Sequence, residues 1–115
     1  MELTFSNEFE YIPIFNDNRE NENPVKIICR YMTTPERSKY IENKLITVNG
    51  EIQSQTIFHN DAILKASITG IENLKVNGVE IKTAKALLEI EGLSQLSEEI
   101  ASYIATRNLS PDLKN

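Results

Sequence analysis

Apolar residues in the first third of the chain follow one another at the short spacing that is typical of strands, and not at the spacing of one face of a helix. Between Leu3 and Phe15 this spacing predicts an edge strand or a hairpin, in which Pro13 removes one backbone donor. The apolar, β-branched run VKIICRYM, which begins at Val25, predicts the clearest strand of the chain. The polar segment NDNRENENP before it predicts a turn or loop that buries nothing.

The next part of the chain predicts a short helix followed by a hairpin. Thr34 can cap a helix that has Pro35 at its first position and runs to about Asn43. In the run LITVNGEIQ, the pair Asn49-Gly50 tolerates the two positive φ angles of a tight turn. We therefore expect two short strands joined at that pair.

The segment from residue 60 to 78 predicts a helix and a second turn. Asn60 or Asp61 can cap a helix that begins near Ala62, and apolar residues at helical spacing cover a broad face as far as Leu74. Gly70 is a weak point in that helix, because glycine disfavours a helix interior. The pair Asn77-Gly78 repeats the turn signal and predicts a joint before the C-terminal helices.

The C-terminal third predicts two helices. Thr83 can cap the segment AKALLEIE, and Gly92 can end this helix in the left-handed conformation. Ser94 can cap the last helix, whose apolar side chains form one stripe that we interpret as core. The stripe comprises Leu93, Leu96, Ile100, Tyr103 and Ile104.

The length and these elements together predict one α+β domain over residues 1–115. A chain of 115 residues is near the commonest domain size and fills one core. We expect a small antiparallel N-terminal sheet packed against three or four helices, with a helical C-terminal half and a flexible tail at about residues 109–115.

Composition and charge narrow the classes of partner. With 12 Lys and Arg against 17 Asp and Glu, the net charge of -5 makes the average surface repel phosphate. This weighs against general nucleic-acid binding and against anionic membranes. Cys29 is the single cysteine and lies in an apolar run, which favours a small buried side chain. The N-terminus is not typical of a secretion signal, so we expect a cytoplasmic protein.

Candidate chemistry is sparse. His59 is the only histidine, and no spacing of carboxylates singles out a partner for it, so a surface or helix-entry position is favoured. Glu98 and Glu99 are adjacent on a predicted helix, point about 100° apart, and suit a solvated face. The loop from Asp17 departs from a calcium loop, since Arg19 occupies a ligand position. We predict no catalytic, cofactor-binding or metal-binding residues, and no enzyme.

A helix-turn-helix regulator is a minor alternative. The run AKALLEIEGLSQLSEEIASYI has a helix, a glycine turn and a second helix, as such DNA-binding proteins do. The residues that would enter the major groove are Gln95, Ser97, Glu98 and Glu99. Two carboxylates at that surface would repel the phosphates, so this alternative is disfavoured.

The order of features resembles a known family. A strand-rich start, the RYMTTPERSKY turn into a helix, and DAILKASITGIENLKVNGVEI followed by LLEIEGLSQLSEEIASYI are similar to tail assembly chaperones of long-tailed bacteriophages and prophages. The pattern rests on Gly70, Ile71, Leu74, Asn77-Gly78 and Ile81. The family often has tryptophan after the glycine, where this chain has Ile71.

The resemblance implies a binding protein without a cofactor. Members of that family bind the long, helical tape-measure protein and keep it soluble during tail morphogenesis in the bacterial cytoplasm. The expected partner is therefore the tape-measure protein or another tail protein, and a homo-oligomer is possible. The alternative from a different class is a structural subunit of the virion, such as a tail-completion or connector protein.

Overall fold

The computed structural model describes residues 1–4 and 6–109. Apart from Leu109, the predicted flexible tail lies outside the described residues. The elements, in chain order, are β1 (Glu8–Tyr11), the 3-10 helix η1 (Phe15–Glu20), β2 (Lys26–Arg30), α1 (Thr34–Tyr40), β3 (Ile41–Val48), β4 (Glu51–Phe58), α2 (Asn60–Ser67), β5 (Ile68–Glu72), β6 (Lys75–Val76), β7 (Val79–Glu80), α3 (Ala84–Leu88), the 3-10 helix η2 (Glu91–Leu93) and α4 (Ser94–Leu109).

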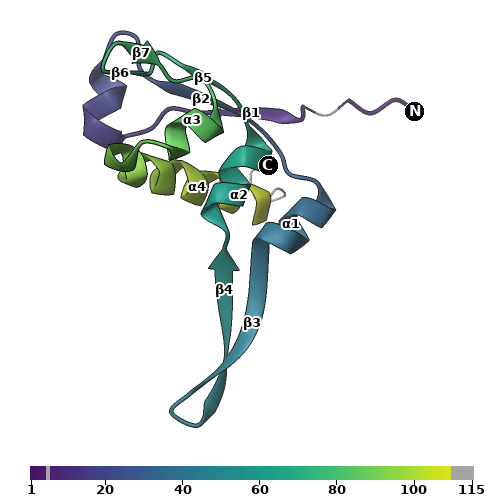
Figure 1. The fold of residues 1–115 in the computed structure, drawn as a ribbon. Helices are drawn as coiled ribbons and strands as arrows, with labels where there is room; N and C mark the ends of the chain where they lie inside the picture. The colour runs from purple at the N-terminus through teal and green to yellow at the C-terminus, as the bar shows by residue number, and fades with distance from the viewer. Residues whose placement is uncertain (5, 110–115) are drawn as a thin grey trace.

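A three-stranded antiparallel sheet in the order β1-β2-β5 forms one layer, and α2, α3 and α4 lie on one side of it (Figure 1). The predicted α+β class is thereby confirmed. The edge position predicted for the first strand is also confirmed, since β1 pairs only with β2 in this sheet. The strand predicted at VKIICRYM is confirmed as β2, which is central in the sheet. Cys29 lies in that central strand and is completely buried, as its apolar surroundings indicated.

The core lies between this sheet and the helices. Ile27 of β2 and Ile71 of β5 are directly paired and buried. They share the core with the predicted stripe of α4, where Leu96, Ile100 and Ile104 are at most 2% exposed. The interpretation of that stripe as core is confirmed. Because the apolar face of α4 is used inside the domain, it is not available to a partner.

The helix predicted from Ala62 to Leu74 is wrong in its second half. The helix α2 ends at Ser67, whose hydroxyl donates to the backbone oxygen of Arg30, and the chain continues as β5. The physical reason is that the central strand β2 needs a second antiparallel neighbour, and Ile71 is buried by facing Ile27. Tertiary pairing overrides the helical spacing of these apolar residues.

Several predicted helix ends are also corrected. The first helix is capped by Thr33, not Thr34, and ends at Tyr40, because Ile41 already pairs with Phe58 in the hairpin. Asn43 is therefore in a strand. In the second half, α2 begins at Asn60 after His59, and neither Asn60 nor Asp61 caps it.

The two C-terminal helices differ from prediction at their junction. Thr83 caps α3 as expected, since its hydroxyl accepts from the Ala86 N–H at 3.1 Å. The helix ends at Leu88, and Gly92 lies in η2 without a positive φ, so it does not act as a left-handed stop. Ser94 is itself helical and begins α4 after η2. A 3-10 turn thus replaces the glycine stop.

The polar loop before β2 buries a residue, contrary to expectation. The Asn18 side chain is 6% exposed and donates to the backbone oxygens of Pro13 at 2.8 Å and Val25 at 3.1 Å. Its carbonyl oxygen accepts from the Val25 N–H at 2.7 Å. Asn18 therefore ties the two ends of the loop together and satisfies backbone groups that the turn would leave unpaired.

None of the helices in the described part of the chain combines the length and the hydrophobicity that a membrane span requires.

Replacing Asn18 with alanine should destabilise the domain by about 2 to 3 kcal/mol, because buried backbone donors and acceptors lose their partner. Asn21→Ala, three residues further on and exposed, is the matched control and should change the free energy of unfolding by less than about 0.5 kcal/mol. Urea denaturation of the two variants measures the difference. Equal stability of Asn18→Ala and the parent chain would contradict this role for Asn18.

Candidate protein-binding site

The strands β3 and β4 form an arm that projects from the body of the molecule (Figure 1). They pair with each other over eight residue pairs and join no other strand of the described chain. At roughly 3.4 Å per residue the arm is about 27 Å long. The radius of gyration of 16.3 Å exceeds the roughly 13 Å typical of a compact domain of this length, as an arm of that reach requires.

The turn at the end of the arm has the chemistry that the sequence predicted. Asn49 has φ 52° and Gly50 has φ 80°, so both central residues are left-handed, and Val48 pairs with Glu51 across the turn. Such a turn matches the right-handed twist of its strands. The predicted hairpin is confirmed, with strands of eight residues each.

The arm has one face without charge. Residues directly opposite each other in an antiparallel pair share a face, so the register assigns every side chain to one of two faces. The uncharged face, as we call it, comprises Ile41, Asn43, Leu45, Thr47, Ile52, Ser54, Thr56 and Phe58. The opposite, charged face comprises Glu42, Lys44, Ile46, Val48, Glu51, Gln53, Gln55 and Ile57.

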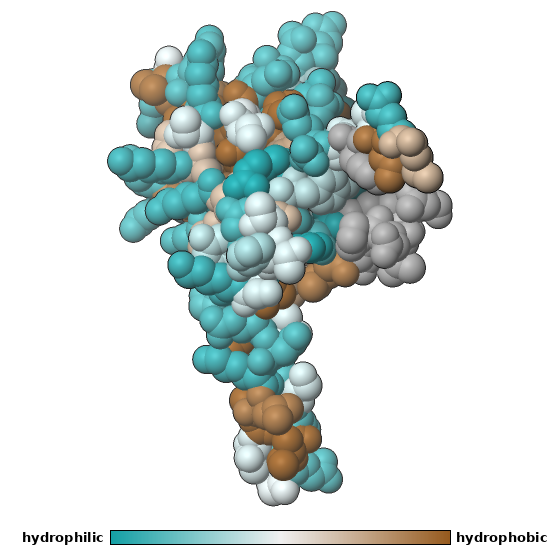
Figure 2. Space-filling view, turned by 90° about the vertical axis from the view of Figure 1, so that its right-hand side faces the viewer, coloured by the Kyte–Doolittle hydropathy of each residue, from teal (hydrophilic) through white to brown (hydrophobic). Residues whose placement is uncertain are grey.

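The uncharged face exposes large apolar side chains toward the end of the arm. Leu45 is 78% exposed and Ile52 is 75% exposed, whereas Phe58, at the base, is 41% exposed. In Figure 2 hydrophobic residues gather near the far end of the arm, on an otherwise mostly hydrophilic surface. An isolated two-stranded ribbon is marginally stable in water, and contiguous exposed apolar surface marks interaction sites. The arm is therefore the best candidate for a protein-binding site.

The base of the arm is held by the capping of α1. The Thr33 hydroxyl accepts from the Glu36 N–H at 3.3 Å, and Glu36 accepts in return from the Thr33 N–H at 2.9 Å. The Arg30 guanidinium donates two hydrogen bonds to the Glu36 carboxylate, at 3.0 and 2.8 Å. These bonds from Arg30, followed by that from Thr33, lower the pKa of Glu36 to about 2. They fix the helix that leads directly into β3.

His59 also lies at the base of the arm, immediately before α2, as the prediction of a helix-entry or surface histidine required. Its side chain is 46% exposed, and its Nε2 lies 3.1 Å from Oε1 of Glu42 on β3. The pair links the end of β4 to the start of β3. Cys29, by contrast, is inside the body, where burial raises the pKa of its thiol to about 12.

One of the two adjacent glutamates is not part of a solvated face. The Glu99 carboxylate accepts from the Tyr11 hydroxyl at 2.6 Å, from the Ile14 N–H at 2.8 Å and from the Phe15 N–H at 3.1 Å. Burial, and then the hydrogen bond to Glu99, raises the pKa of Tyr11 to about 12. Glu99 is thus a tether between α4 and the segment after β1. The sequence contained no local signal for it, since its partners are more than 80 residues away.

The position of Glu99 also disfavours the helix-turn-helix alternative. Of the four residues that would face DNA, Ser97 is buried and Glu99 is bound to the N-terminal segment, which leaves Gln95 and Glu98 exposed. A lone exposed carboxylate would still oppose phosphate. In the segment after Asp17, Arg19 is held by the backbone, since its Nε donates to the backbone oxygen of Ile12 at 2.8 Å.

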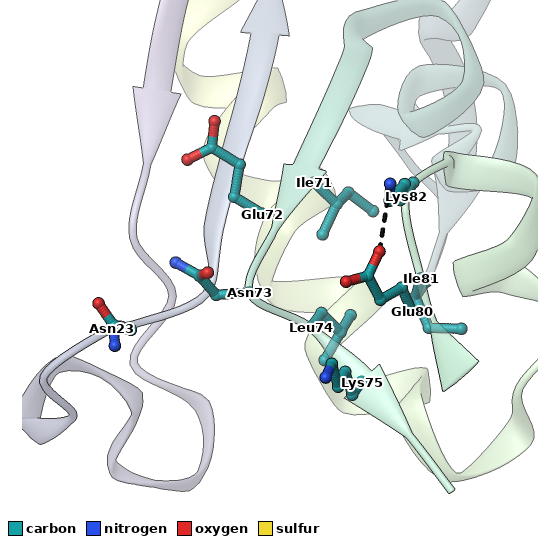
Figure 3. Close-up of a pocket in the computed structure, with 9 residues that line it drawn as sticks. All are labelled: Asn23, Ile71, Glu72, Asn73, Leu74, Lys75, Glu80, Ile81 and Lys82. Carbon is teal, nitrogen blue, oxygen red and sulfur yellow. Dashed lines mark ion pairs between the residues drawn. The ribbon is translucent and has the colours of Figure 1, made fainter. Parts of the chain in front are cut away.

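A hollow of about 690 Å³ lies at the other end of the body, beside β5 and the β6–β7 turn. Figure 3 shows the residues that line it, among them Ile71 and Ile81 and the ion pair between Glu80 and Lys82, whose charged atoms are 3.1 Å apart. Its further charged residues, Glu72 and Lys75, are also of opposite sign. The charges balance, so the hollow favours neither an anion nor a cation. Within the described part of the chain no three His, Cys, Asp or Glu side chains are grouped as a metal site.

Comparisons with protein-family models, with curated proteins and with solved structures give no match for this chain.

The low pKa of Glu36 predicts a pH-dependent contribution to stability. A carboxyl whose folded pKa lies below its unfolded value of 4.5 stabilises the fold above about pH 4.5, and this contribution is lost as the pH falls toward 2. Glu36→Gln should therefore lower the unfolding free energy at pH 6 but change it progressively less below pH 4.5. Urea denaturation across this range measures the effect, with the exposed Glu89→Gln as control. A constant difference between pH 6 and pH 2.5 would contradict the assignment.

Proposed function

We propose that this chain is a tail assembly chaperone-like protein, which uses the uncharged face of the β3–β4 arm to bind the apolar side of a helical tail protein in the bacterial cytoplasm. The observation that carries the proposal is the exposure of Leu45 and Ile52 on a face of eight uncharged residues. An apolar partner loses no charge pairing when it covers such a face, whereas the charged face would be costly to desolvate.

The tape-measure protein is the partner that the resemblance implies. Gly70 and Ile71, which carry part of the resemblance, lie in β5. Asn77-Gly78 form the turn between β6 and β7, which lies at the opposite end of the body from the arm (Figure 1). Ile71 is a core residue. These residues shape the body, and the arm supplies the contact surface. A net charge of -5 on the whole chain supports solubility while apolar surface is exposed.

A structural subunit of the virion is the second candidate. The observation that favours it is the length of the arm, since eight paired residues on each strand reach far beyond the body and can cross onto a neighbouring subunit. A permanent assembly would also keep the apolar residues covered after the tail is complete. Both candidates bind protein through the arm, but they differ in whether the chain leaves the finished particle.

Replacing both Leu45 and Ile52 with serine should abolish binding to the helical partner without unfolding the chain. Because both side chains are at least 75% exposed, the change in unfolding free energy should stay within about 0.5 kcal/mol. The measurement is co-expression with a tape-measure protein, scored as the amount of soluble tape-measure protein. The matched control is Lys44→Ser with Gln53→Ser on the charged face. If this control loses binding equally, the uncharged face is not the contact surface.

The two candidates predict different particle compositions. A chaperone acts before the tube closes around the tape-measure protein, so purified virions should lack this chain. Quantitative mass spectrometry of particles and of the lysate measures its distribution. Recovery of the chain in particles in a fixed ratio to the tube protein would reject the chaperone and leave the structural subunit.

A further inference from the structure

The outer edge of β4 carries backbone groups that the arm itself does not pair. The His59 N–H donates to the Tyr40 backbone oxygen at 2.9 Å, so the odd-numbered residues of β4 direct their backbone groups toward β3. Backbone direction alternates along a strand. The even-numbered residues, Ile52, Ser54, Thr56 and Phe58, therefore direct their N–H and C=O groups outward, away from β3.

This edge lacks the features that usually protect an edge strand. From Ile52 to Phe58 the strand has seven residues without charge, proline or glycine, and its register with β3 contains no bulge. Natural proteins blunt free edges with charges, prolines or bulges, and unprotected edges pair with another strand. The strand β3 is blunted by Glu42 and Lys44. The unprotected edge of the arm is thus specifically that of β4.

We propose that β4 pairs with β4 of a second copy of this chain, antiparallel, across a two-fold axis at Gln55. The result is a four-stranded sheet in the order β3, β4, β4 of the second copy, β3 of the second copy. Because opposed residues share a face, the uncharged faces of the two arms become one continuous surface. The pairing goes beyond the proposed function, since it uses only the edge of β4 and holds whichever protein covers that face.

Complementarity of the strand with itself selects this register. Only the even-numbered residues of β4 have outward backbone groups, so only they can form hydrogen bonds with the second copy. Even-numbered residues therefore always oppose even-numbered ones, and the alternative registers place the two-fold axis one or more residues earlier or later. With the axis at Gln55, Ile52 lies opposite Phe58 of the second copy, an apolar pair. Glu51, the only charged residue of β4, then lies opposite His59 of the second copy, whose side chain is 46% exposed. A carboxylate and an imidazole can form a hydrogen bond there.

The neighbouring registers are less favourable. With the axis at Thr56, the positions opposite Ile52 and Glu51 would be Asn60 and Asp61 of the second copy. These belong to the helix α2 and cannot continue a strand ladder, so Ile52 would have no partner. With the axis at Ser54, Glu51 would lie opposite Ile57, and Ile52 would lose its aromatic neighbour for a threonine. Apolar pairing and the extent of the ladder therefore agree on the axis at Gln55.

A single cysteine at the axis tests the proposal in the purified chain. In Gln55→Cys the two introduced cysteines face each other in a non-hydrogen-bonded pair, about 4.5 Å apart between Cα atoms, which a disulfide accommodates. We expect a disulfide-linked dimer after mild oxidation, scored on a non-reducing gel. The native Cys29 is completely buried and does not compete. Gln55 is exposed, so the variant should fold as the parent does.

The matched control is Lys44→Cys. Lys44 pairs with Gln55 and lies on the same face, but it belongs to the other edge of the arm. In the proposed dimer the two introduced cysteines would be about 14 Å apart, which is three strand spacings, so this variant should cross-link at least tenfold less. Equal cross-linking of the two variants would overturn the proposal. So would the absence of a Gln55→Cys dimer.

A proline on the edge provides an independent measurement. Ser54 directs its N–H outward, so Ser54→Pro removes a donor from the interface while the ladder between β3 and β4 keeps its bonds. Light scattering at rising protein concentration should show the parent chain approaching twice the monomer mass and Ser54→Pro remaining a monomer. A parent chain that stays monomeric at several hundred micromolar would refute the pairing but leave partner binding through the uncharged face untouched.

Discussion

The rest of the structure depends on β2 having an antiparallel neighbour on each side. Its residue Ile27 faces Tyr11 of β1 and Ile71 of β5, and it is completely buried. Full burial of one such side chain contributes about 1.5 to 3 kcal/mol. The sheet gives the helices α2 and α4 a surface to cover, and their apolar faces close the core. Without β5, Ile71 would be exposed and β2 would be an edge strand.

The same strand also determines where the arm leaves the body. At the end of β2, Arg30 pairs with Glu36 and orients the short helix α1. The capping box of Thr33 and Glu36 fixes the beginning of this helix, and Ile41, buried at the start of β3, fixes its end. The cap of α1 and the buried Ile41 thus hold a ribbon that pairs with no other strand in the described part of the chain. The body gives the arm a defined direction, and the turn at Asn49-Gly50 fixes its register.

The division between body and arm explains the distribution of polar groups. Inside the body, Asn18 and Glu99 satisfy backbone donors that irregular segments leave unpaired. In the arm the regular ladder pairs the inner backbone groups, and the outer groups of β4 pair with no other strand among the described residues. The edge formed by β3 is protected by charged residues, whereas the edge formed by β4 is not. Likewise, one face of the arm is charged and the opposite face is uncharged. The two proposed contacts therefore use different surfaces of the arm, the edge of β4 for a second copy and the uncharged face for another protein.

The sequence by itself determined the features that depend on neighbouring residues. The turns at Asn49-Gly50 and Asn77-Gly78, the cap at Thr83 and the apolar stripe of α4 follow from backbone preference and from spacing within a few residues. The tertiary structure decided the rest. Residues 68–74 carry a helical pattern, but β2 is about forty residues earlier in the chain, and only the folded arrangement makes it their neighbour. The hairpin turn at the candidate site could be predicted from the sequence. The projection of the hairpin from the body could not, because a local sequence pattern does not specify whether a strand joins the main sheet.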